Sequence, residues 1–117
     1  MNPFVHLELH TPDEQAAAAF YTSLLSWRPE RIRAGGGSYL ALDAGGQVGG
    51  GIVECGTDRA VWLPYVVVDD LDAVTERATG LGAAVLIGPR TSRAGRRSVV
   101  RSPAAGEIAF WEPREDV

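Results

Sequence analysis

The length, composition and charge of the chain limit what it can be. Its 117 residues suit a single domain, and 45% hydrophobic with 22% charged residues is an ordinary globular balance. The net charge of -4 argues against binding to nucleic-acid phosphates. No apolar run approaches the roughly 20 residues of a membrane helix. Cys55 is the one cysteine, so no internal disulfide can form and we expect a reducing, cytoplasmic location.

The first segment predicts a strand followed by a helix. Apolar and polar residues alternate over Val5–His10, which indicates a strand with two unlike faces. Its polar face holds His6, Glu8 and His10. Thr11 is expected to cap the helix and Pro12 to lie in its first turn. The helical spacing of apolar residues then continues to Leu25.

Three further strands are predicted in the first half. Pro29 interrupts residues 27–32, so this strand should lie at the edge of its sheet. Residues 38–42 and 47–53 read as two strands joined by a turn. The glycines at 49–51 indicate a bulge or a close approach by another group.

The second half repeats this order of elements. A strand over 62–68 precedes a helix that Asp70 opens and Gly82 stops, and a short strand over 84–87 ends at Gly88-Pro89. Strands over 97–102 and 107–112 follow. The duplication predicts one domain with modules at 1–55 and 60–117. The expected fold is α+β, with two βαβββ modules forming curved mixed sheets and a concave cleft.

Several motifs in this order resemble the vicinal-oxygen-chelate superfamily, the glyoxalase, bleomycin-resistance and dioxygenase-like proteins. The motifs are Val5–Leu9, Phe20–Trp27, Val48–Ile52, Tyr65–Asp72, and Ser102–Gly106 with Phe110–Pro113. The resemblance covers nearly the whole chain and implies the fold described above, but no particular reaction. It also implies a homodimer, because relatives of this size usually close their clefts as two-fold pairs.

The resemblance further implies a divalent metal site, for which this chain lacks most ligands. His6 matches the first-strand ligand, whereas the matching positions in the second half are Leu63 and Ala109. Residues 38–42 supply no carboxylate or imidazole. Because one imidazole does not hold a divalent ion, we expect no metal and no cofactor. Purified protein should carry less than one ion per chain.

Alternation then predicts a ligand cleft. Counting inward positions from the family's ligand positions gives His6, Glu8, Tyr39, Leu63, Tyr65, Glu107, Ala109 and Trp111. Within this set the polar residues of the first strand have three interpretations. They hydrogen-bond a ligand, they form a shifted metal site through the histidine pair His6 and His10, or they are a plain polar face with His10 at the strand end in solvent.

Two residue sets have a functional and a structural interpretation. Trp27, Tyr39, Trp62, Tyr65 and Trp111 form aromatic cleft walls as a set, although each alone is typical of packing. Arg90, Arg93, Arg96, Arg97 and Arg101 form either an anion site or, more simply, a solvated mobile loop.

Three functional hypotheses remain open. The first is a metal-independent protein that binds an aromatic or natural-product ligand and so sequesters a drug. The second is an enzyme, an isomerase, lyase or hydrolase, with His6 or Glu8 as general base or with a displaced metal site. The third is a subunit or regulatory module whose cleft is vestigial.

Overall fold

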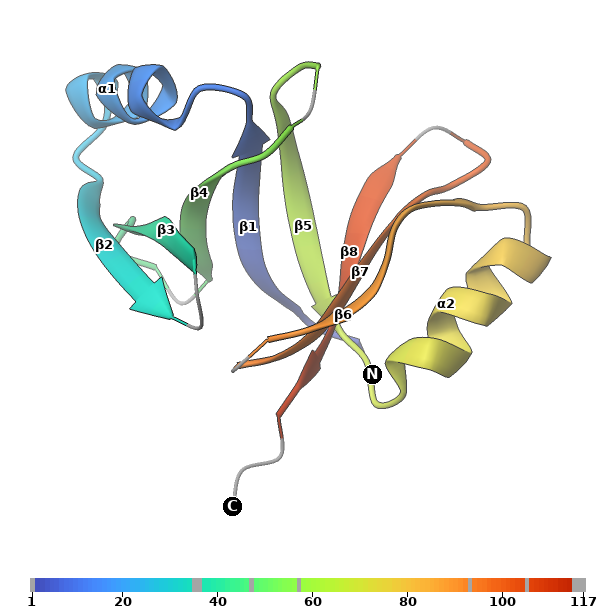
Figure 1. The fold of residues 1–117 in the computed structure, drawn as a ribbon. Coiled ribbons are helices and arrows are strands. Elements are labelled where there is room, and N and C mark those ends of the chain that lie inside the picture. The colour runs from blue at the N-terminus through green and yellow to red at the C-terminus, as the bar shows by residue number, and fades with distance from the viewer. Residues whose placement is uncertain are drawn as a thin grey trace. The chain divides into compact units, whose positions relative to one another are not determined.

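The computed structural model describes residues 2–34, 37–46, 48–56, 58–92, 94–104 and 106–114. The chain forms two compact units, Val5–Leu63 (unit 2) and Met1–Phe4 with Pro64–Val117 (unit 1). Strands and helices follow one another in the order β-α-β-β-β, twice over (Figure 1). The predicted α+β class is therefore confirmed. Neither helix in the described part of the chain is long and apolar enough to cross a membrane.

In unit 2, strand β1 pairs in parallel with β4, and the remaining pairs are antiparallel, in the order β2-β3-β4-β1. The elements are β1 (Phe4–Thr11), α1 (Glu14–Leu24), β2 (Arg28–Ala34), β3 (Gly37–Asp43) and β4 (Gly49–Glu54). The strand with Pro29 lies at the edge of the sheet, as predicted. An edge position suits proline, because an edge strand pairs with one neighbour only and the N–H that proline lacks is not needed to pair with a second strand.

The predicted cap of α1 is wrong by two residues. Asp13 is the N-cap, and its carboxylate accepts a hydrogen bond from the Ala16 amide at 3.0 Å. Thr11 still belongs to β1, and its hydroxyl accepts from the Asp13 amide at 3.1 Å. The carboxylate at position 13 reaches the third residue of the helix, which is the geometry of an N-cap.

The core of unit 2 lies between its sheet and α1. Leu9, Leu40, Leu42 and Ile52 are buried together, and Ala17, Ala18, Tyr21, Trp27 and Trp62 pack against them. These buried residues come from three adjacent strands, and the pairing of Ile52 with Leu9 and with Leu40 puts them on one face. The opposite face of the sheet is therefore turned away from α1.

In unit 1, β5 (Val61–Val67) pairs in parallel with β8 (Glu107–Pro113), and the order is β5-β8-β7-β6. Strand β7 spans Gly95–Arg101 and β6 spans Ala84–Thr91. The prediction that β6 stops before Gly88-Pro89 is wrong. The strand continues through both residues with two register shifts, which its place at the edge of the sheet permits.

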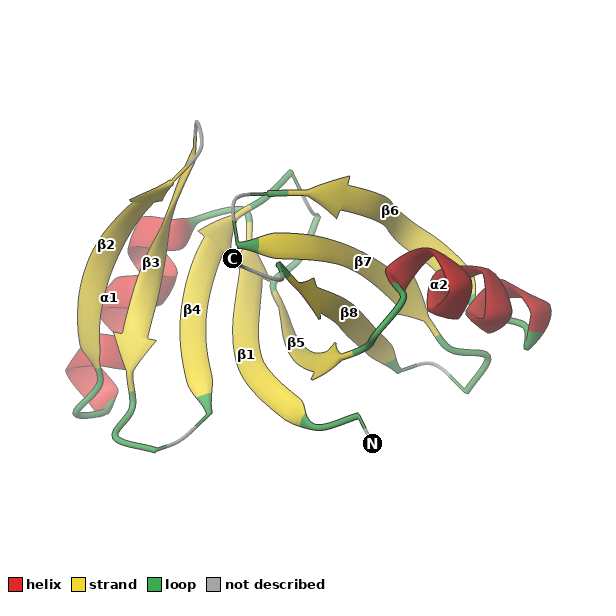
Figure 2. Cartoon of the chain, turned by 90° about the horizontal axis from the view of Figure 1, so that it is seen from below, coloured by secondary structure: helices red, strands yellow, loops and turns green. Residues whose placement is uncertain are grey.

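Helix α2 (Leu71–Gly80) packs on one face of this sheet (Figure 2). Asp70 caps it, as predicted, and accepts from the Ala73 amide at 3.1 Å. The Thr75 and Ser98 hydroxyls hydrogen-bond at 2.8 Å, so the Ser98 face of β7 is the one that α2 covers. The predicted stop holds too: Gly82 follows the helix end with φ +100°, a conformation that glycine adopts without strain.

Removing the most buried side chain of unit 2 should destabilise the protein. Ile52 is fully buried, so Ile52→Ala should lower the free energy of unfolding by about 2–5 kcal/mol through lost burial and a cavity. Urea denaturation measures the change. Val48→Ala, at an exposed position, is the control and should change it by less than about 0.5 kcal/mol. Equal effects of the two variants would contradict this packing.

Candidate functional site

Three polar side chains of β1 stand on the face of the unit 2 sheet that is turned away from α1. His6, Glu8 and His10 alternate with Leu9, whose side chain belongs to the core. We refer to these three residues as the polar cluster. The prediction of a strand with one polar and one apolar face is thus confirmed.

Glu8 joins the two imidazoles. His6 Nε2 lies 3.1 Å from Glu8 Oε2, and His10 Nε2 lies 3.0 Å from Glu8 Oε1. An ionised carboxylate only accepts hydrogen bonds, so with Glu8 ionised both imidazoles donate from Nε2. The Nδ1 atoms then either accept, in a neutral ring, or carry a second proton.

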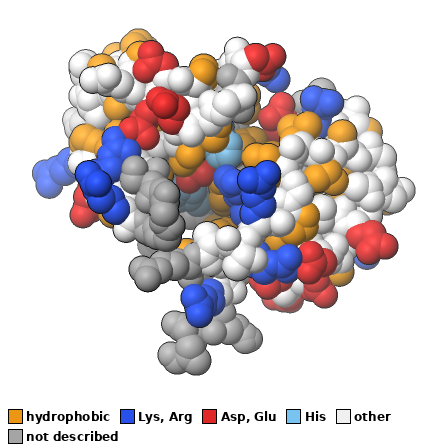
Figure 3. Space-filling model, viewed as in Figure 1, with side chains coloured by type: hydrophobic (Ala, Val, Ile, Leu, Met, Phe, Trp, Pro, Cys, Tyr) orange, Lys and Arg blue, Asp and Glu red, His pale blue; other side chains and the backbone are white. Residues whose placement is uncertain are grey.

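The expectation of His10 in solvent is wrong. His10 is only 3% exposed and Glu8 8%. The side chain of His6 is the most open of the three, at 24%, and histidine surface is visible in the space-filling view (Figure 3). The cluster is therefore most accessible to solvent at its His6 end. Burial of a carboxylate requires hydrogen-bond partners, and His10 supplies one of them.

Glycines make room for the His6 ring. Strands β1 and β4 pair His6 with Gly49 and Glu8 with Gly51. A Cβ at Gly49 would lie 2.9 Å from His6 Nδ1, closer than real side chains approach, and one at Gly51 would lie 3.5 Å from both His6 Nε2 and Tyr39 Cδ2. The close approach predicted for this glycine run is confirmed. It also places the predicted site residue Tyr39 beside His6.

Unit 1 carries the other predicted site residues on the face that α2 leaves uncovered. Tyr65 pairs with Ala109, and Trp111 pairs with both Val67 and Arg97. Glu107 follows on the same face by alternation, whereas Ser98 faces α2. The predicted register of β5 and β8 therefore matches the structure in this unit. Leu63, which the contacts assign to unit 2, is buried.

Four of the five arginines lie on strands, Arg90 on β6 and Arg96, Arg97 and Arg101 on β7, so the interpretation as a solvated loop is wrong for these four. Arg97 lies on β7 and donates to the Tyr65 hydroxyl at 3.1 Å. Arg96 donates to both carboxylate oxygens of Asp72, at 2.8 and 3.0 Å, and this bonding lowers the pKa of the Asp72 carboxyl. Arg93 lies outside the described residues. The sequence did contain a signal for these different roles. Side chains alternate between faces along the strand 95–101, so the neighbours Arg96 and Arg97 point in opposite directions.

The aromatic set divides between faces. Trp27 and Trp62 pack on the α1 side of the unit 2 sheet with the apolar core, whereas Tyr39 lies beside Gly51 and His6 on the other side. The hypothesis that the whole aromatic set forms the cleft walls is therefore wrong for Trp27 and Trp62. Tyr65 and Trp111 of unit 1 share one face of their own sheet.

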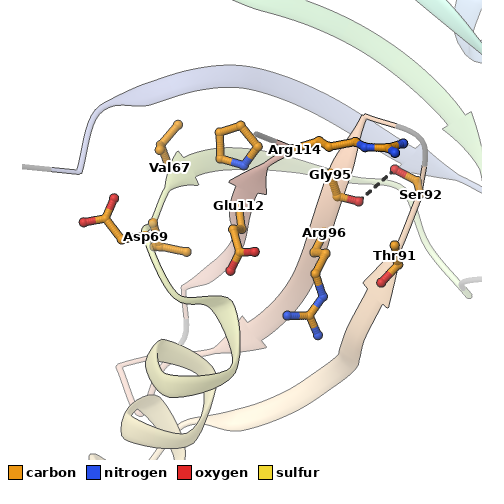
Figure 4. Close-up of a pocket in the computed structure, with 10 residues that line it drawn as sticks. Val67, Asp69, Thr91, Ser92, Gly95, Arg96, Glu112 and Arg114 are labelled. Carbon is orange, nitrogen blue, oxygen red and sulfur yellow. Dashed lines mark hydrogen bonds between the residues drawn. The ribbon is translucent and has the colours of Figure 1, made fainter. Parts of the chain in front are cut away.

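A hollow in unit 1 lies where α2 begins (Figure 4). It has a volume of about 730 Å³, and Asp69, Arg96, Glu112 and Arg114 are its charged lining residues. Glu112 accepts a hydrogen bond from the Leu71 amide at 2.8 Å, so this carboxylate caps the helix. The sequence analysis did not anticipate that role. The positive end of the α2 dipole is therefore already met by a carboxylate of the protein.

The residues do not fit the metal site that the family resemblance implies. Leu63 and Ala109 replace two ligand positions and offer no donor atom. In the polar cluster both Nε2 atoms point at Glu8 oxygens at hydrogen-bond distance. Among the described residues, no group of three or more histidine, cysteine, aspartate or glutamate side chains is arranged to hold an ion. We derive no chemistry through a metal, and its expected absence stays a prediction.

Comparison with known proteins identifies the family of the chain. A family model described as a glyoxalase-like domain matches residues 6–111. CFP32 of Mycobacterium bovis, provisionally named a glyoxylase, is 29% identical over 119 residues, which cover 95% of this chain and 46% of that protein. The anthracycline biosynthesis protein DnrV of Streptomyces peucetius is 29% identical over 122 residues, covering 89% and 44%. The chain thus spans about half the length of these relatives.

Solved structures share the fold at low sequence identity. A hypothetical protein from Bacillus halodurans has a TM-score of 0.68 at 12% identity, covering 99% of this chain and 97% of that one. Methylmalonyl-CoA epimerase from Mycobacterium tuberculosis has a TM-score of 0.62 at 15% identity, covering 95% and 87%. These structures share the fold, and the match of the glyoxalase-like family model to residues 6–111 makes the chain a member of the vicinal-oxygen-chelate superfamily. Within that superfamily, the chain belongs to the glyoxalase-like domain family.

The glycine under His6 gives a direct test of the cluster geometry. Gly49→Ala should displace the imidazole, because the new Cβ would lie 2.9 Å from Nδ1. We expect a shifted His6 ring resonance in NMR spectra and a loss of about 1–3 kcal/mol of stability. Gly50→Ala is the matched control, since its Cβ would meet nothing closer than 3.5 Å. An unmoved His6 signal in Gly49→Ala would contradict this arrangement.

Proposed function

We propose that this chain is a metal-independent small-molecule-binding protein of the glyoxalase/bleomycin-resistance type. The observation that carries the proposal is the carboxylate of Glu8, 8% exposed and held between two imidazoles. A buried polar network lowers stability unless all of its hydrogen bonds are formed. Apolar side chains would therefore stabilise a small domain at least as well at these positions. Fixed in place and open at His6, the cluster offers a ligand an oriented hydrogen-bonding group.

We propose that the ligand is an aromatic natural product and that binding sequesters it, as in drug resistance. The Tyr39 ring lies beside Gly51 and His6, so a flat molecule on this face meets an aromatic side chain and an imidazole together. Two relatives are named as anthracycline biosynthesis proteins. The other predicted ligand contacts are Leu63 of unit 2 and, in unit 1, Tyr65, Glu107, Ala109 and Trp111.

Binding of an anthracycline is the test. Daunorubicin fluorescence should change on titration with the protein. Trp111→Ala should weaken binding by about 1–3 kcal/mol through lost stacking and burial. Glu8→Gln should weaken it too, because the amide removes the negative charge and must donate to one imidazole, which forces that ring into its other tautomer. Fluorescence titration gives each dissociation constant.

Two controls separate the site from general effects. Leu81→Ala alters an exposed apolar side chain beyond the end of α2 and should leave the affinity unchanged. Excess EDTA should also leave it unchanged if no metal takes part. Failure of wild-type protein to bind would refute the anthracycline-type ligand. An unchanged affinity in Trp111→Ala would mean that Trp111 only packs.

A second candidate function is acid–base catalysis on the same cluster. Glu8 Oε2 lies 3.1 Å from His6 Nε2, and a carboxylate that orients an imidazole is an arrangement that general bases use. His6 is also the more open imidazole. Turnover of a bound ligand, abolished by His6→Ala with the fold intact, would favour an isomerase, lyase or hydrolase. Stoichiometric uptake of ligand without turnover would favour the binding protein.

We propose a homodimer as the working assembly. Helix α1 has no buried residue, and Phe20 and Leu24 are 59% and 64% exposed. Exposed apolar side chains gathered on one helix are typical of interaction surfaces. The relatives are about twice as long as the segment that matches this chain, which leaves room in them for a second unit of similar size.

Light scattering tests this assembly. At micromolar concentration we expect the mass of two chains, and Phe20→Asp should shift the equilibrium toward the monomer because it places a charge in an apolar contact. Thr79→Asp, at an exposed position on α2, is the control and should leave the mass unchanged. A wild-type monomer at this concentration would count against the dimer.

A further inference from the structure

A second hollow, separate from the one at the start of α2, lies in unit 2. It is on the face of the unit 2 sheet opposite the polar cluster. Its volume is about 480 Å³, within the range of small-molecule pockets. It is lined by Leu7, Trp27, Leu42, Ala44, Gly46, Val48, Gly49, Gly50 and Trp62. None of these described lining residues carries a charge. Leu42 belongs to the core that packs against α1, so the hollow opens on the α1 side.

Two indoles form a corner of this hollow. The Trp27 and Trp62 ring centroids are 6.1 Å apart and the ring planes meet at 82°. Trp62 donates its one N–H to the Tyr21 hydroxyl at 3.1 Å, and Tyr21 stacks on Trp27 at 5.8 Å. The indole N–H of Trp62 is therefore already used within the protein. A flat ring that stacks on one indole presents its edge to the other, which is a favourable aromatic geometry.

The floor of the hollow is backbone. Gly50 pairs with Leu7 and Leu42, whose side chains line the hollow, so a side chain at position 50 would project into it. A Cβ there would meet Leu42 O at 3.5 Å and Leu42 Cβ at 3.6 Å, which are ordinary contacts. The rim is open, because Leu7 and Val48 are 46% and 44% exposed.

We infer that this hollow binds an uncharged aromatic small molecule, at a site separate from the polar cluster. The lining offers apolar contact and no charge, which disfavours ionic ligands. The perpendicular indoles select a planar ring over a flexible chain. Glycine at position 50 leaves the floor free for that ring. The polar cluster takes no part, since its side chains lie on the other face of the sheet.

The probe for this site is N-phenylnaphthylamine, an uncharged aromatic dye that fluoresces when it leaves water. Wild-type protein should bind one dye per chain, with energy transfer from tryptophan. Val48→Asp places a charge at the rim and should weaken binding at least about tenfold. Gly50→Val fills the floor and should weaken it similarly. Val85→Asp, on β6 of unit 1 and 41% exposed, is the matched control and should bind like wild type.

Glu8→Gln distinguishes the two sites. It should leave dye binding unchanged while weakening daunorubicin, so either proposal can fail alone. The inference is overturned if wild-type protein does not bind the dye, if Val48→Asp and Gly50→Val bind it as tightly as wild type, or if Glu8→Gln abolishes binding. It is also overturned if dye binding falls as the protein concentration rises, since a second copy would then cover the hollow.

Discussion

The parallel pairing of β1 with β4 is the interaction on which unit 2 depends. It sets Glu8 against Gly51 and His6 against Gly49, so the imidazole lies over backbone and not over side chains. The same register sets Leu9 against Ile52, which are buried on the opposite face. A slip of one residue would exchange the two faces. It would turn the histidines toward the core and turn Leu9 away from it.

One sheet therefore presents two unlike surfaces within a few ångströms of each other. On one side Glu8 fixes two imidazoles, and on the other Trp27 and Trp62 form an apolar corner. The glycine run serves both sides, because alternate glycines face opposite ways. Gly49 and Gly51 leave room for His6, and Gly50 leaves the apolar hollow open.

Local rules of sequence were enough to predict the element order, the edge position of Pro29 and the cap at Asp70. Each depends on a residue and its immediate neighbours. The burial of His10 could not be predicted in that way, because a strand end is buried or exposed according to what packs over it. The packing of Trp62 on the α1 side of the sheet could not be predicted either, for the same reason. Its partner is Tyr21, 41 residues away along the chain, and no spacing rule connects the two.

The outermost strands in the strand order, β2 and β6, both contain proline and arginine. Strand β2 contains Pro29 among three arginines, and β6 contains Pro89 followed by Arg90. Proline lacks the N–H that a further strand would need, and like charges repel an identical edge. Growth of these sheets by addition of strands from other molecules is therefore blocked at both strands. Concentrated protein should accordingly resist fibril formation, and copies that do associate must meet through side-chain surfaces.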